Sequence, residues 1–256
     1  MKLPFSFQTL ACALGFCLAA NSAHALDILP LGDSITYGYI NPSEQGSNGY
    51  RAQLYSDLNK DVTFVGSQTD GNLPQPNNEG HNGYTIEEID QGLKGVPTGS
   101  RASGANNSNN GGHWLDGGNG TNRPAITPDV VLLGIGTNNA TDGQPVVVME
   151  ANLKQLLADL KADLPNAQIF VGSVPPRNDD PAREAVQQQY NAAIPAIVAA
   201  AGPKFHFVNI HDAINFSNIS GTDGVHPTRT GYDKIGDTWY QALVSTGVVS
   251  GSGLSP

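Results

Sequence analysis

Short apolar runs alternate with helix-like stretches along most of the chain. The runs that we predict as strands are Asp27–Leu31, Val62–Val65, Val130–Leu133, Gln168–Val171 and Phe205–Ile210. Each is short, and each has the aliphatic, β-branched or aromatic content of a strand that is buried on both faces. Strands that alternate with helices are typical of a parallel sheet covered on both sides. The pattern therefore predicts an α/β fold with five strands in a doubly wound order, which binds ligands at the carboxyl ends of its strands.

The helix-like stretches lie between these strands. They are Tyr50–Leu58, Thr85–Leu93, Val146–Leu164, Ala182–Ala201 and Thr230–Val244. The third is the clearest, because its apolar side chains repeat at helical spacing along one stripe. We expect Pro195 to kink or divide the fourth.

Two stretches do not follow the alternation. Gln68–Asn82 and Thr98–Arg123 are rich in Gly, Asn, Ser and Pro, so they cannot bury much apolar surface. We predict long surface loops at the ligand-binding end of the sheet. Connections of this length are more often functional or mobile than inert, although an inert loop has the same composition.

The N-terminus has the features of a secretory signal peptide. A basic residue, Lys2, precedes the apolar stretch Leu10–Ala20, which is too short to cross a bilayer, and a small-x-small cleavage site ends at Ala25. The alternative is a buried helix of the domain itself. We predict a signal peptide over residues 1–25, a single domain over 26–256 and an extracellular location.

Charge and cysteine content narrow the function. Thirteen Lys and Arg against 23 Asp and Glu give a net charge of −10, which repels phosphates and anionic lipid headgroups. Nucleic acid and membrane surfaces are therefore not expected as partners. Both cysteines, Cys12 and Cys17, lie in the predicted signal peptide, so the mature domain has neither disulfides nor thiol chemistry.

A serine follows the first predicted strand, within the segment Leu31–Gly38 (LGDSITYG). A serine at a strand's carboxyl end lies where a doubly wound fold binds its ligand, so Ser34 is a candidate nucleophile. In the competing interpretation, Asp33 or Ser34 only caps the next helix. The segment lacks the Gly-x-Ser-x-Gly elbow, so an α/β-hydrolase fold is not implied.

A serine nucleophile needs a base, and the base needs an acid that orients it. Near the C-terminus, Asp223 and His226 are three residues apart, which lets both side chains reach one serine from a single turn. In that arrangement Asp223 holds one ring nitrogen and the other takes the proton of Ser34. The alternative is an ordinary Asp-Gly surface turn that precedes the last helix.

Two further segments offer donors for an oxyanion. Gly136-Thr137-Asn138 follows the third predicted strand, and Gly80 precedes the Thr85 helix. A backbone N–H and an Asn amide at strand ends suit the charge that develops in acyl transfer. Each signal is weak alone, because Gly and Asn crowd loops for conformational reasons.

Together these segments resemble the four blocks of the SGNH (GDSL-type) hydrolase superfamily. The blocks are matched by Gly32-Asp33-Ser34, Gly80, Gly136-Thr137-Asn138 and Asp223-x-x-His226. The sequence around these blocks is similar to carbohydrate esterase family 3, the acetylxylan-esterase-like branch. The similar segments are Leu31–Gly38, Asn48–Arg51, Val65–Ser67, Glu79–Ile86 and Pro128–Asn138.

The resemblance implies a flavodoxin-like sheet with Ser34 as nucleophile, His226 as base and Asp223 as its orienting acid. It implies an oxyanion hole from the N–H groups of Ser34 and Gly80 and the side chain of Asn138, with Gly83 as the less favoured choice for the second block. The family commonly has Asp after that Asn, whereas this chain has Asn139. This difference affects how the loop is anchored but leaves Asn138 in place.

Other titratable residues compete for these roles. His211-Asp212 is an acid-base pair in sequence, but neighbours on an extended chain point to opposite faces. We expect His206 to be a packed strand residue, and His81 and His113 to be loop residues within reach of substrate. No metal-ligand pattern is present in the mature chain, so neither a catalytic metal nor another cofactor is expected.

Three functions are consistent with the sequence. The first is a secreted serine esterase that removes acetyl groups from acetylated plant-wall polysaccharide such as xylan. The second is a short-chain lipase, thioesterase or lysophospholipase on the same fold, which needs an apolar acyl groove. The third is a non-catalytic carbohydrate-binding protein that stacks sugars on Tyr37, Tyr84 and Trp114. We favour the first, acting as a monomer, with these aromatic residues as sugar contacts.

Overall fold

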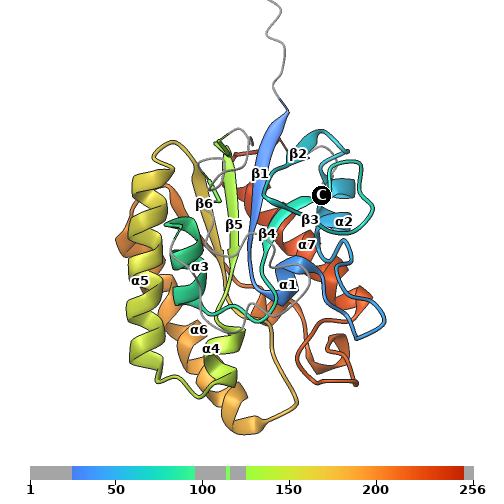
Figure 1. The fold of residues 1–256 in the computed structure, drawn as a ribbon, viewed down its shortest axis with the longest axis vertical. Helices are drawn as coiled ribbons and strands as arrows, with labels where there is room; N and C mark the ends of the chain where they lie inside the picture. Colours follow the sequence, from blue (N-terminus) through green and yellow to red (C-terminus); the bar gives the residue numbers. More distant parts are fainter. Residues whose placement is uncertain (1–24, 96–113, 116–124, 251–256) are drawn as a thin grey trace, which may run out of the picture.

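Five parallel strands form the centre of the computed structural model, which describes residues 25–95, 114–115 and 125–250. They are β1 (Leu26–Gly32), β2 (Val62–Phe64), β5 (Val130–Gly134), β6 (Gln168–Gly172) and β7 (Phe205–Val208). Their spatial order, β2-β1-β5-β6-β7, places the first strand between the second and third (Figure 1). This is the flavodoxin-like doubly wound order, so the predicted fold is confirmed.

Part of the segment expected to be a surface loop is built into the sheet. β4 (Asn77–Gly80) pairs with the carboxyl half of β1, where β2 no longer reaches, and β3 (Gln68–Thr69) pairs antiparallel with β4. The prediction of a loop over Gln68–Asn82 is therefore wrong for these residues. The prediction failed because β4 is buried although its residues are polar. Asn78 bonds to Asp70, and Glu79 accepts hydrogen bonds from the N–H and hydroxyl of Ser67.

Helices cover both faces of the sheet (Figure 1). One face carries α3 (Ile86–Leu93), α5 (Val146–Asp163) and α6 (Pro181–Ala201); the other carries α2 (Arg51–Asp57) and α7 (Arg229–Ser245). All five were predicted within a few residues. α6 continues without a break through Pro195, because the single hydrogen bond that a proline removes is outweighed by the packing of Ile194 and Ile197 on either side.

The strands divide their side chains between two cores. In β5, Val131 and Leu133 face the α3–α5–α6 core, while Val130 and Leu132 face the α2–α7 core. This alternation is what a strand buried on both faces requires. Among the described residues, no helix is both long and apolar enough to cross a membrane.

Short helices follow the carboxyl ends of the strands. α1 (Ser34–Tyr37) follows β1 and α4 (Thr137–Thr141) follows β5, at the same end of the sheet (Figure 1). The 3₁₀ turns η1 (His211–Ala213) and η2 (Phe216–Asn218) follow β7. The predicted signal peptide and nearly all of the predicted loop Thr98–Arg123, including His113, lie outside the described residues.

Candidate active site

Ser34 is the first residue of α1, two positions after β1 ends. The preceding residue, Asp33, caps the helix, since its Oδ1 accepts the Ile35 N–H at 3.0 Å. The turn also needs glycine at position 32, where a Cβ would lie 2.1 Å from the carbonyl oxygen of Gly134 on β5. The capping interpretation thus holds for Asp33, whereas the Ser34 hydroxyl takes no part in the cap.

The segment between η2 and α7 brings an acid and a base to this serine. Asp223 Oδ1 accepts the N–H groups of Val225 and His226 at 2.9 and 3.0 Å, which folds a tight turn. Asp223 Oδ2 lies 2.7 Å from His226 Nδ1, and His226 Nε2 lies 2.7 Å from Ser34 Oγ. The three predicted residues therefore form a continuous relay, although Ser34 and His226 are 192 residues apart in sequence.

The local electrostatics keep Asp223 ionised. Partial burial raises its pKa, but hydrogen bonds from the His226 ring and from the backbone N–H groups of Val225 and His226 outweigh burial and lower the pKa to about 2. A carboxylate in this position holds the imidazole in one orientation and stabilises its protonated form. The relay has the electrostatic arrangement that transfer of a proton from Ser34 requires.

Asn138 lies on α4 beside the serine end of the sheet. Its amide nitrogen donates one hydrogen bond to the Tyr84 carbonyl at 2.8 Å, which leaves the second N–H for another acceptor. The next residue, Asn139, is buried: its Oδ1 accepts the Ile86 N–H and its amide donates to Glu87 and Gln144. Asn139 thus anchors α4 to α3 in the place where the family commonly has Asp.

Gly80 ends β4 and packs against α1. A Cβ there would lie 2.2 Å from the Tyr37 nitrogen, so the close approach of β4 to α1 requires glycine. The Gly80 N–H donates to Asn78 Oδ1 at 2.8 Å, and it reaches a substrate oxygen only by exchanging that bond. Gly83 has a positive φ of 83° and a Cβ position that faces open space.

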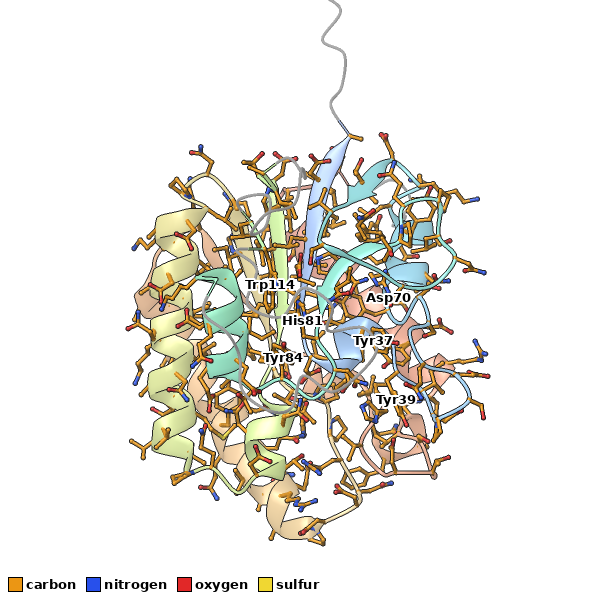
Figure 2. The ribbon with its side chains drawn as sticks, in the orientation of Figure 1. Tyr37, Tyr39, Asp70, His81, Tyr84 and Trp114 are labelled. Carbon is orange, nitrogen blue, oxygen red and sulfur yellow. The ribbon has the colours of Figure 1, made fainter. Side chains whose placement is uncertain are left out.

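The expected sugar platforms are buried, which corrects that prediction. Tyr37, Tyr84 and Trp114 expose 4 %, 0 % and 0 % of their surface, so none offers a ring face to a substrate. Trp114 stacks on the ring of His81, with the ring centroids 3.8 Å apart and an angle of 9° between the ring planes, and Tyr84 packs beside both (Figure 2). Tyr84 and Trp114 are thus part of the hydrophobic core.

An aromatic side chain that the sequence did not single out contacts the base. The Tyr39 ring lies 4.4 Å from the His226 ring, and the Tyr39 carbonyl accepts the Tyr232 hydroxyl at 2.6 Å. Tyr39 is half-buried and stands apart from the Trp114 group (Figure 2). Its only sequence signal is a position just beyond α1, since the pairing with His226 spans most of the chain.

The other histidines have structural partners. His211 contacts Asp212 at 3.1 Å and Glu184 at 3.2 Å, so our argument that His211 and Asp212 diverge is wrong, because they lie on a 3₁₀ turn and not on an extended strand. With both ring nitrogens against carboxylates, His211 has none left for a hydroxyl nucleophile.

The other two histidines of the described residues, His81 and His206, lie in a strand or directly after one. His206, in β7, packs on the Phe170 ring of the neighbouring strand β6, as expected. His81 was expected near substrate, but it is fully buried and contacts Glu79 at 2.9 Å. In the described part of the chain, no group of three His, Cys, Asp or Glu side chains is placed to hold a metal ion.

Comparison with known proteins agrees with this geometry. Residues 31–234 match the model of the GDSL-like lipase/acylhydrolase family. A multidomain esterase of Ruminococcus flavefaciens is 28 % identical over 94 % of this chain, which spans only 31 % of that protein's length. A family 3 carbohydrate esterase structure from Clostridium thermocellum is 31 % identical, with a TM-score of 0.66, and the match covers 89 % of this chain and 99 % of that one.

A second solved structure shares the fold at lower identity. It is a family 3 carbohydrate esterase from Talaromyces cellulolyticus, 21 % identical with a TM-score of 0.62, matched over 88 % of this chain and all of its own. The predicted resemblance to the SGNH superfamily is thereby confirmed. The chain belongs to the GDSL-like lipase/acylhydrolase family, on the branch that resembles carbohydrate esterase family 3.

Proposed function

We propose that this protein is a secreted serine esterase that removes acetyl groups from acetylated plant-wall polysaccharide such as xylan. The observation that carries the proposal is the unbroken relay from Asp223 through His226 to Ser34, with both hydrogen bonds at 2.7 Å. A carbohydrate-binding protein has no need of such a relay, and its expected stacking platforms are buried.

The first half-reaction forms an acyl-enzyme. His226 Nε2 takes the proton of Ser34 Oγ while that oxygen bonds to the ester carbonyl carbon, giving a tetrahedral intermediate. When the intermediate collapses, the C–O bond to the sugar breaks and His226 returns the proton to the leaving sugar oxygen. Ser34 then carries the acetyl group, and the sugar hydroxyl is free.

The second half-reaction repeats these steps with water. His226 removes a proton from water as the water oxygen attacks the acetyl carbonyl carbon. The proton then passes to Ser34 Oγ as the bond between Ser34 Oγ and the acetyl carbon breaks. Acetic acid leaves and ionises to acetate in solution, and the enzyme is restored. Throughout, Asp223 stays ionised and stabilises the imidazolium, in agreement with its lowered pKa.

The developing oxyanion needs donors that are already in place. We assign this role to the Ser34 N–H, which as the first amide of α1 has no acceptor within the helix, and to the second amide proton of Asn138. The Gly80 N–H is the third proposed donor and must exchange its bond to Asn78 Oδ1 to serve.

The substrate class is supported by relatives and by side chains near the relay. The similar structures are named carbohydrate esterases. We propose Tyr39, in place of the three buried aromatics, as the ring that borders the sugar beside His226. The relatives also share their fold with lipolytic enzymes, so a short-chain lipase or thioesterase is the competing function.

The test is acetate release from acetylated xylan, acetylated mannan and pectin, compared side by side with wild-type protein and the Ser34→Ala variant. We expect release from xylan by wild type and a loss of at least a thousand-fold in Ser34→Ala, because residual catalysis rests on binding and oxyanion donors alone. Retention of a tenth of the activity by Ser34→Ala contradicts the mechanism. Release from mannan or pectin alone contradicts the xylan assignment but leaves the esterase proposal standing.

A further inference from the structure

A buried arginine lies between the two halves of the proposed site. Arg177 belongs to the connection from β6 to α6 and exposes 1 % of its side chain. Its guanidinium binds both carboxylate oxygens of Asp179, with Nε to Oδ1 at 2.6 Å and Nη2 to Oδ2 at 2.7 Å. A bidentate pair of this kind fixes direction as well as distance.

The third guanidinium nitrogen reaches the helix that carries Asn138. Arg177 Nη1 donates to Thr141 Oγ1 at 2.8 Å and approaches the Thr137 carbonyl at 3.5 Å. Thr137 and Thr141 lie on either side of Asn138 in the same turn of α4. The position of Arg177 is thus tied to the proposed oxyanion donor.

The other end of the pair abuts the turn that carries the acid and the base. The Asn178 N–H donates to the Gly224 carbonyl at 2.8 Å. Gly224 has a φ of +68°, and a Cβ there would lie 2.7 Å from the Asp179 nitrogen. Asp223 directly precedes Gly224 in the chain, so a shift of Asp179 is transmitted to the relay through backbone contacts.

The connection is also attached to α6 independently of the arginine. Asn191 bonds to both the N–H and the carbonyl of Val174, at 2.8 and 2.9 Å, and Gln187 donates to the Pro175 carbonyl at 2.5 Å. Changing the guanidinium therefore alters the link from α4 to the Asp223 turn without releasing the connection from the core.

We propose that Arg177 is a positioning residue that sets the distance between the Asn138 donor and the His226–Ser34 pair; this inference rests on the proposed esterase function. Arg177 touches neither substrate nor the reacting atoms. It acts through Asp179 on one side and α4 on the other. Because displacement of about 1 Å in an active site can cost a hundred-fold in rate, a linker of this rigidity has a measurable effect on turnover.

The test compares Arg177→Lys and Asp179→Asn with Arg183→Lys. Lysine keeps the charge but cannot bind a carboxylate and Thr141 together in a planar fork. Arg183 is the matched control, since it contacts the same Asp179 carboxylate at 3.3 Å from a side chain that is 41 % exposed. Each variant is assayed with p-nitrophenyl acetate, for inhibition by phenylboronic acid, and for its melting temperature.

We expect kcat to fall roughly ten- to a hundred-fold in Arg177→Lys and Asp179→Asn with KM nearly unchanged. Affinity for the boronate, which adds to Ser34 Oγ as a tetrahedral mimic of the transition state, should fall by the same factor. Arg183→Lys should match wild type. A purely structural role lowers the melting temperature but not the kcat or boronate affinity of the folded protein.

Wild-type kcat in Arg177→Lys overturns the inference, as does a loss that appears in KM alone. If Arg177→Lys fails to fold, Asp179→Asn decides the question, because it breaks the same pair from a more exposed side chain. The proposed function fails separately: in that case wild-type protein itself releases no acetate.

Discussion

Asp33 is a buried acid next to the proposed nucleophile, and its charge is costly. It exposes 1 % of its surface, and burial raises its pKa to about 6, against smaller opposing effects from the Ile35 N–H and the His226 ring. A carboxyl group whose pKa is raised in the folded state binds protons more tightly there than in the unfolded chain. Its ionisation therefore destabilises the fold as the pH rises from about 4 to about 6.

Asp33→Asn should remove this penalty. Asparagine still caps α1, and raising the pKa of Asp33 from 3.8 to about 6 corresponds to roughly 3 kcal/mol. We expect the variant to gain stability over wild type at pH 8 and to lose that advantage at pH 4, measured by urea unfolding across pH. Asp61→Asn, an exposed surface change, is the control. An Asp33→Asn difference that stays constant with pH would disprove the argument.

At the scale of elements, the sequence predicted what periodicity encodes. The apolar stripe of α5 predicts a helix and the β-branched runs of β5 and β6 predict strands, and the structure has these elements at those positions. β4 was missed because its residues, Asn77–Gly80, are polar; only contacts distant in sequence, such as Ser67 to Glu79, make their burial favourable.

Trp114 is a single side chain whose burial also depends on contacts that are distant in sequence. A tryptophan in a Gly- and Asn-rich segment resembles a sugar platform, yet its ring fits over Gly92 of α3, where a Cβ would lie 2.0 Å from the indole. The glycine and the stacked His81 make a slot that no pattern in the sequence indicates. Trp114 is thus a docking residue of the core.

Trp114→Ala should therefore act on stability and not on substrate binding. Removing a fully buried tryptophan is expected to cost about 3–5 kcal/mol in the free energy of unfolding, while KM for acetylated xylan stays near the wild-type value. Phe216→Ala, at an aromatic side chain that is 52 % exposed, should cost well under that amount. A large rise in KM with little loss of stability would restore the platform interpretation.

For the whole molecule, the site is an assembly of four segments that the fold brings together at one end of the sheet. The order of blocks along the chain, with the family resemblance, was enough to name Ser34, Asp223, His226 and Asn138 as candidates. It was not enough to find Tyr39 or Arg177, whose roles depend on neighbours in other segments. Spacing identifies residues within one turn, whereas contacts between segments exist only once the chain has folded.

Acyl-chain preference separates the proposed acetyl esterase from a lipase or thioesterase. The cavity that borders Asp33 measures about 20 Å³, and neither Ser34 nor His226 lines it, so it does not provide a fatty-acyl groove at the relay. Each methylene left in water forgoes about 0.8 kcal/mol of binding. We expect kcat/KM on p-nitrophenyl esters to fall from acetyl to butyryl and to become negligible by octanoyl. A profile that rises with chain length would favour the lipase or thioesterase function.

The split neighbour of β1 has a consequence for how this domain tolerates change in length. β2 pairs with β1 as far as Ile28, β4 resumes the pairing at Leu31, and β3 pairs with β4, so the excursion out of the sheet is the turn of residues 70–76 between β3 and β4. The Gly32–Gly80 register is fixed by close packing, not by the length of the intervening chain. Since doubling a flexible loop costs only about 0.6 kcal/mol in closure entropy, this excursion is a natural position for grafting an extra peptide or a whole accessory module.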